Sequence, residues 1–260
     1  MGTSVGTWLK YVLRSGSLEF AASMNRSGSV QPRRMRFAGK PIHYRSATSD
    51  PHLIYGILLK TGKKAEYRFP QAFRPRVILD IGANIGVASV LFAHRFPGAA
   101  VHAIEPVPSN VEILRRNAEA WPAITPHSIA LANQAGIMEL IVSPDARNFG
   151  GFSIYQRGAA PGAQRIRVPA QTPSQFLAAN RISQVDLIKI DTEGAEHAIL
   201  KSFDPQMLAE TTWITGELHG EEDFELLVYL SRWFDLELKK SFRKPLFIFR
   251  ACNKKALDLV

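Results

Sequence analysis

The chain has 260 residues, 46% of them hydrophobic and 10% aromatic, which is enough to fill a core and excludes a mainly disordered or fibrous protein. The single cysteine, Cys252, excludes an internal disulfide and a cysteine-based zinc site. The formal net charge is +9, and the whole excess lies in residues 1–70, which hold 12 Lys and Arg against 3 Asp and Glu.

Residues 1–70 are predicted to form a basic N-terminal extension that binds a substrate or partner, ahead of a domain at 71–260. Residues 8–13 have apolar side chains at helical spacing beside basic ones, which indicates a short amphipathic helix on a membrane, a partner or the protein's own domain. Residues 31–45 carry five Lys and Arg and no acid. They are interpreted either as a solvated arm or as a region that attracts an anionic partner or substrate.

No apolar stretch approaches the roughly 18–20 residues that a membrane span needs, and no secretory signal is visible. We therefore expect no transmembrane segment and a cytoplasmic location. The sequence makes no prediction of the oligomeric state.

From residue 76 onward, short apolar runs alternate with helical stretches. Strands are predicted at 77–81, 100–104 and 124–131, with helices at 87–95 and from Pro108. Beyond them we expect short strands at 137–142, 152–155 and 166–170, followed by a capping box at 172–175. Two more strands are predicted at 185–190 and 211–218, with helices at 195–200 and 223–233. The last predicted element is a hairpin formed by 236–239 and 246–250. This order predicts an α/β fold: a Rossmann-like, doubly wound, mostly parallel sheet with a C-terminal antiparallel hairpin and a basic N-terminal extension.

Four predicted strands end in or beside an acid: Asp80, Glu105, Asp191 and Glu217. Ligands of open parallel sheets bind outside the carboxyl ends of the strands, so these acids are candidate site residues. Asp80 precedes a loop with Gly82, Asn84 and Gly86, whose glycines let the backbone turn tightly near a ligand. Glu105 ends the second strand, where a carboxylate can accept both hydroxyls of a ribose. The pair of acids indicates an adenosine-bearing cofactor.

The loop does not match the dinucleotide fingerprint G-x-G-x-x-G, because Asn84 stands where the middle glycine would be. An acid ahead of the loop also suits a cationic amine better than a pyrophosphate, which it would repel. The loop resembles that of S-adenosylmethionine-dependent methyltransferases of class I. In that fold, Ala130 and Leu131 would lie near the adenine.

Several further motifs narrow the family. Residues 186–196, DLIKIDTEGAE, resemble the signature of the FkbM family of methyltransferases, as do Glu105-Pro106 with Asn117 behind them and Glu217-Leu218-His219. The resemblance spans about 77–219. One departure is the stretch 172–174, Thr-Pro-Ser where the family has Thr-Leu-Asp, which removes a carboxylate from that loop.

The resemblance implies methyl transfer from S-adenosylmethionine to a hydroxyl oxygen of a small molecule, sugar or glycan. An alcohol is a poor nucleophile until its proton is accepted, and a positioned base accelerates such a step by roughly 10²–10⁴-fold. His219 is the first candidate because imidazole titrates near neutrality. Glu217 would orient His219 or share its role, and Asp191 is an equal alternative. Glu196 is predicted to be structural.

Other hypotheses stay open. Asp191, Glu193, Glu217 and His219 could assemble a divalent-cation site, although no metal is predicted. A nucleic-acid methyltransferase could use the basic N-terminal residues, but no motif for an extruded base occurs, so a nucleic-acid partner is not expected. A non-catalytic binding protein that retains the cofactor fold is a third hypothesis. Residues 148–153 are interpreted either as a Gly-rich hairpin or as part of the cofactor or acceptor opening.

Overall fold

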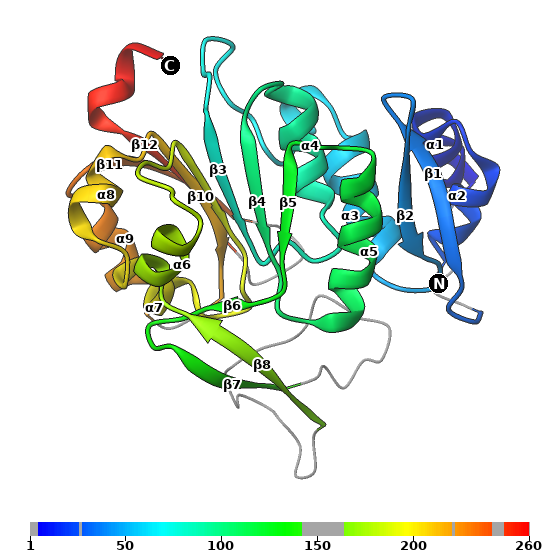
Figure 1. Cartoon of the computed structure of the whole chain (residues 1–260). Helices are drawn as coiled ribbons and strands as arrows, with labels where there is room; N and C mark the ends of the chain where they lie inside the picture. The colour runs from blue at the N-terminus through cyan, green and yellow to red at the C-terminus, as the bar shows by residue number, and fades with distance from the viewer. Residues whose placement is uncertain (1–4, 26–27, 142–163, 220–221, 241–246, 260) are drawn as a thin grey trace.

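A computed structural model describes residues 5–25, 28–141, 164–219, 222–240 and 247–259 (Figure 1). Its largest sheet has seven strands in the spatial order β11 (Phe234–Lys240), β12 (Phe247–Asn253), β10 (Trp213–Leu218), β9 (Leu187–Ile190), β3 (Val77–Ile81), β4 (Ala100–Ile104) and β5 (Ile124–His127). The strands from β10 to β5 run parallel, and β12 and β11 form an antiparallel hairpin at one edge.

Helices cover both faces of this sheet (Figure 1). One face carries α4 (Val87–Arg95) and α5 (Pro108–Glu119), and the other carries α6 (Pro173–Ala179), α7 (Glu196–Lys201), α8 (Pro205–Glu210) and α9 (Asp223–Leu230). Successive residues of a strand point to opposite faces, so Ile78 joins the first hydrophobic cluster and Leu79 the second. Burial on both faces explains the continuous apolar runs of the central strands. The predicted doubly wound α/β fold is confirmed.

The N-terminal residues pack against the face that carries α4 and α5. Their elements are α1 (Val5–Ser15), α2 (Leu18–Ser23), the hairpin β1 (Pro32–Phe37) and β2 (Lys40–Arg45), α3 (Asp50–Ile54), a π-helical turn η1 (Tyr55–Leu59) and a 3₁₀ turn η2 (Gly62–Lys64). Phe20, Ile42 and Ile54 are fully buried in the same cluster as α4 and α5. The Asn117 side chain of α5 also bonds the backbone N–H and C=O of His43, at 2.7 and 3.1 Å. The N-terminal residues therefore complete this side of the core.

A small sheet of β6 (Ala130–Leu131), β8 (Arg165–Gln171) and β7 (Gly136–Ile141) lies beyond the carboxyl ends of the parallel strands (Figure 1). The prediction of one strand over 124–131 is therefore wrong, because the chain leaves the main sheet after His127 and pairs with β8 instead. The capping box at Thr172 and Gln175 is confirmed. The predicted strand at 152–155 and the motif at 148–153 lie outside the described residues.

The last described element is a 3₁₀ turn, η3 (Lys254–Leu259). Cys252 is buried in β12 as a free thiol. Among the helices that the structure describes, none combines the length and the apolar character that crossing a bilayer requires.

Candidate functional site

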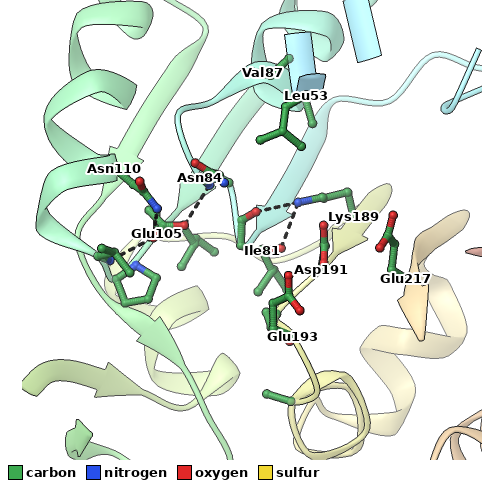
Figure 2. Close-up of a pocket in the computed structure, with 18 of the residues that line it drawn as sticks. Leu53, Ile81, Asn84, Val87, Glu105, Asn110, Lys189, Asp191, Glu193 and Glu217 are labelled. Carbon is green, nitrogen blue, oxygen red and sulfur yellow. Dashed lines mark hydrogen bonds between the residues drawn. The ribbon is translucent and has the colours of Figure 1, made fainter. Parts of the chain in front are cut away.

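A cavity of about 530 Å³ opens at the carboxyl ends of β3, β4, β9 and β10. It lies where the connections from β3 and from β9 lead to opposite halves of the sheet, the place where open α/β sheets bind ligands. Its lining includes residues from the predicted site and from the N-terminal segment: Gly82, Asn84, Glu105, Ala130, Leu131, Asp191, Glu193, Glu217, Leu53, Glu66 and Tyr67. Figure 2 shows the polar side chains that face this space.

The loop after β3 forms one wall of the cavity. Gly82 has φ +74°, and a Cβ atom there would lie 1.9 Å from the backbone oxygen of Asp191. The absence of a side chain thus allows the β3 loop to touch the end of β9. Gly86, at the start of α4, has φ +83° and faces Leu114, which a Cβ would meet at 2.5 Å. Gly86 serves helix packing and does not line the cavity, whereas Gly82 and Asn84 do.

Asp80 lies beneath the cavity floor and is fully buried. Its carboxylate pairs with the Lys189 ammonium at 3.1 Å and accepts a hydrogen bond from Ser89 Oγ at 2.5 Å. Lys189 in turn donates to the backbone oxygen of Gly82 at 2.7 Å (Figure 2). The sequence predicts a cofactor contact for Asp80; in the structure Asp80 does not line the cavity, and its partner Lys189 holds the loop. Lys189 was missed, although a charged residue inside an apolar strand was a visible signal.

Glu105 lies at the end of β4 with its carboxylate held from two sides (Figure 2). One oxygen accepts the backbone N–H of Asn84 at 2.8 Å, and the other accepts the N–H of Val107 at 3.0 Å and the Asn110 amide at 3.2 Å. Burial raises the pKa of Glu105, and these hydrogen bonds oppose the rise. The result is a fixed carboxylate at the cavity wall, as a ribose-binding acid requires.

The adjoining part of the cavity is apolar. Ala130 and Leu131 of β6 line it together with Met138 and Leu140 of β7. These apolar side chains share the cavity lining with Glu105. The flat face of an aromatic ring can pack against them.

Three carboxylates from the sheet and from the turn after β9 face the other end of the cavity, beside Lys189 (Figure 2). Asp191 ends β9, Glu217 lies on β10, and Glu193 sits in the turn before α7 with φ +55°. A non-glycine residue at positive φ is strained, and here the turn presents the Glu193 carboxylate to the cavity. The side chains of Asp191 and Glu217 are 32% and 26% exposed.

His219 stands behind these acids and does not line the cavity. Its Nε2 lies 3.5 Å from Glu217, 3.8 Å from Glu193 and 3.9 Å from Asp191, and its Nδ1 lies 3.3 Å from Glu196. Glu196 also accepts the backbone N–H groups of Thr192 and Gly194, at 2.7 and 3.0 Å. Glu196 therefore fixes the turn after β9 and orients the imidazole.

The four acids around His219 change its charge state. Burial by itself would lower the pKa of His219, but hydrogen bonds to Glu196 and Glu217 and the charge of Asp191 raise it to about 11. Burial raises the pKa of Asp191 to about 6 and that of Glu193 to about 7. In this arrangement the imidazole is protonated at neutral pH, so it donates hydrogen bonds and has no lone pair to accept a proton.

Asp191 and His219, two of the four residues considered for a divalent cation, meet a third acid, Glu196, that was not among the four. One atom each of Asp191, Glu196 and His219 lies within 4.8 Å of the other two. Only an unprotonated imidazole nitrogen ligates a metal, so a cation bound here would have to displace the proton of His219.

Glu66 and Tyr67 are two further lining residues that the sequence did not indicate. They follow η2 and reach the cavity from the N-terminal segment. Burial raises the pKa of Glu66, and Glu217 and Asp191 raise it further. No local pattern marks this pair, because only the packing of residues 50–67 against the end of the sheet places them there.

The chain matches the model of the methyltransferase FkbM domain over residues 80–244. It is 28% identical over 170 residues to the 31-O-demethyl-FK506 methyltransferase FkbM of Streptomyces tacrolimicus, covering 55% of this chain and 65% of that protein. It is 26% identical over 157 residues to the methyltransferase sdnD of Sordaria araneosa, covering 50% of this chain and 61% of that protein. In both cases the match spans less than two thirds of the relative's length.

Among solved structures, a precorrin-6y C5,15-methyltransferase from Geobacter metallireducens resembles the chain with a TM-score of 0.42 and 13% identity. That similarity covers 70% of this chain and 81% of the other. The family match extends over more than half of the sequence and contains the loop after β3, Glu105, the acids after β9 and His219. The chain belongs to the family of methyltransferases that carry the FkbM domain.

Proposed function

We propose that the protein transfers a methyl group from S-adenosylmethionine to a hydroxyl oxygen of a small molecule, sugar or glycan. The observation that carries this proposal is one cavity with a fixed carboxylate, Glu105, at one end and the acids Asp191, Glu193 and Glu217 at the other. The first end suits the adenosine part of the cofactor. The second suits a cationic sulfur and an acceptor that must lose a proton.

The lining fits S-adenosylmethionine in shape and charge. Glu105 can accept the two ribose hydroxyls, and the apolar surface of Ala130 and Leu131 can pack against adenine. Carboxylates such as Asp191 attract a sulfonium and an ammonium group through a medium of low dielectric constant. When bound, S-adenosylmethionine supplies an electrophilic methyl group, and the protein must hold the acceptor oxygen in line with it.

Asp191 is our first candidate for the base that accepts the hydroxyl proton. It lines the cavity, its side chain is partly exposed, and burial raises its pKa to about 6, close to a useful working pH. His219 lies behind Asp191 and is protonated, so we assign it the role of balancing the negative charges that face the cavity. Glu193 and Glu217 lie on the same wall and can bind further hydroxyl groups of the acceptor.

Transfer to oxygen has additional support from one relative. The name of the Streptomyces protein describes a methyltransferase for a 31-O-demethyl compound, which places its methyl group on an oxygen. The basic stretch 31–45 stays a candidate for binding an anionic acceptor or partner. Arg33 and Arg34 of this stretch are exposed on β1, but Arg45 is buried in an ion pair with Asp50.

Thermal unfolding tests cofactor use directly. A ligand that binds only the native state stabilises it by about 2.7 kcal/mol at 100 times its Kd, so S-adenosylmethionine should raise the Tm and NAD should not. Glu105→Ala should remove this shift. Glu112→Ala, on the exposed side of α5, is the matched control and should keep it. The absence of any shift for the native protein at saturating S-adenosylmethionine would overturn the proposal.

A methyl-labelled cofactor then identifies the acceptor class. Incubation with panels of alcohols, sugars, amines and oligonucleotides should yield label only on oxygen of a small molecule or glycan. Label on nitrogen or on nucleic acid would replace the O-methyltransferase assignment. Cofactor binding without transfer to any tested class would favour the non-catalytic binding protein.

A further inference from the structure

Four buried polar side chains form a continuous chain from the N-terminal segment to the cavity. The Asp50 carboxylate of α3 pairs with the Arg45 guanidinium of β2 at 2.8 and 3.0 Å. Arg45 Nη2 donates to Asn110 Oδ1 of α5 at 2.9 Å, and Asn110 Nδ2 donates to Glu105 Oε1 at 3.2 Å. The exposed fractions of these residues are 8% or less.

The chemistry of this chain decides which way the Asn110 amide points. A guanidinium carries only donors, so the side that faces Arg45 must be the amide oxygen. The amide nitrogen is then directed at Glu105, where an acceptor is needed. With the Asn110 amide turned over, two donors would face each other at Arg45 and two acceptors would face each other at Glu105.

Asp50 in turn holds the guanidinium in place. One of its oxygens accepts both the side chain and the backbone N–H of Arg45, at 2.8 and 2.9 Å, and the other accepts Nη2. Such a two-pronged carboxylate contact leaves Arg45 one orientation. The same nitrogen, Nη2, also donates to Asn110, so the position of the hydrogen-bonding nitrogen is set by the ion pair.

We propose that Arg45, held by Asp50, is a positioning residue that orients the ribose-binding carboxylate of Glu105 through Asn110. The N-terminal segment would then be part of the cofactor site, in addition to any role in selecting the acceptor. This inference rests on the proposed function, in which Glu105 binds the ribose of S-adenosylmethionine. Of the four residues in this chain of contacts, Asn110 and Glu105 line the cavity, whereas Arg45 and Asp50 do not.

A merely structural role makes a different prediction. The ion pair also joins β2 to α3, and its loss could weaken the fold without changing the site. In that case the Tm of the protein without ligand would fall, while the affinity of the remaining folded protein for the cofactor would stay the same. The two quantities therefore have to be measured separately.

Two variants test the proposal, and the first of them leaves no buried charge unpaired. The double variant Arg45→Met/Asp50→Asn removes both charges and keeps an oxygen that can accept the backbone N–H of residue 45. Asn110→Asp keeps an acceptor for Arg45 but sets a second carboxylate against Glu105 and removes the donor. Arg33→Met, which removes an exposed partner of Glu19, is the control from the same basic stretch.

The measurement is the Kd of S-adenosylhomocysteine by titration calorimetry, together with the Tm of each variant without ligand. We expect at least tenfold weaker binding for the double variant and for Asn110→Asp, and less than a twofold change for Arg33→Met. If folded Asn110→Asp and the double variant bind as the native protein does, the positioning role is refuted. If the native protein itself does not bind, the proposed function fails instead, and the two failures are distinct.

Discussion

Asp80 and Lys189 form a buried ion pair across the two central strands, with Oδ1 and Nζ 3.1 Å apart. The two residues are paired in the parallel register of β3 and β9. Burial by itself would lower the pKa of Lys189, but the carboxylates of Asp80 and Asp191 outweigh it and raise this pKa. The ammonium also donates to the backbone oxygen of Gly82. This pair therefore fixes the cavity floor and the loop above it at once.

Replacing Lys189 by Met should destabilise the protein strongly. Removing one partner of a buried pair leaves an uncompensated charge, which typically costs about 3–5 kcal/mol. The double variant Lys189→Met/Asp80→Asn should recover most of this loss, because Asn carries no charge. Urea unfolding of both variants checks the expectation. Equal stability of the single and double variants would mean that the buried charge of Asp80 is not the source of the cost.

Gly82→Ala should be more harmful than Gly98→Ala. Both glycines have positive φ, +74° and +99°, so each alanine incurs a conformational cost of about 1–2 kcal/mol. At Gly98 a Cβ meets nothing within 4 Å, whereas at Gly82 it would lie 1.9 Å from the backbone of Asp191. We expect the loss at Gly82 to reach about 4 kcal/mol or more and to abolish cofactor binding. Similar unfolding free energies for the two variants would show that the contact between the loop and β9 is unimportant.

The pH dependence of turnover distinguishes the two candidate bases. If Asp191 is the base, kcat/KM should fall as the pH drops through about 6, where the carboxylate becomes protonated. Asp191→Asn should lower the plateau by roughly 10²–10⁴-fold. His219→Gln should instead shift the low-pH fall of kcat/KM to higher pH, because the variant loses a cation that lowers the pKa of Asp191. Loss of activity at every pH in His219→Gln, with Asp191→Asn still active, would assign the role to the imidazole.

His219 also predicts a pH dependence of stability. Its pKa in the folded protein is raised to about 11, whereas an unfolded histidine titrates near 6.5. The stabilisation from its proton is thus complete below about pH 6.5 and decreases as the pH rises toward 11, by up to about 1.4 kcal/mol per pH unit. Urea unfolding between pH 7 and 9 should show this slope in the native protein and a smaller one in His219→Gln. Identical slopes would contradict the protonated imidazole.

Local sequence patterns were sufficient for the doubly wound arrangement of the central sheet. The apolar runs at 77–81 and 100–104 predict buried parallel strands because both faces of such strands must be covered. Their alternation with helical stretches predicts the doubly wound sheet. The same rule places Glu105, Asp191 and Glu217 at one edge, since the carboxyl ends of parallel strands lie together. The structure places all three along one cavity.

Local sequence patterns could not predict which side chains would contact each other when they lie far apart along the chain. Asp80 had the right position for a cofactor contact, yet its pairing with Lys189 depends on the register between two strands that are distant in sequence. His219 had the right chemistry for a base, yet the four surrounding carboxylates set its protonation state. These acids converge only when β9, β10 and the start of α7 pack together.

By itself, the sequence determined the fold class, the methyltransferase family and the edge of the sheet where the site lies, because these follow from local periodicity and from motifs along the chain. Only the tertiary structure decided which acids face the cavity and which support it. It also decided that Arg45 is buried against Asp50 and Asn110, although the basic stretch 31–45 could be interpreted as a solvated arm. The physical reason is that pKa values and hydrogen-bond directions depend on contacts between segments far apart in sequence.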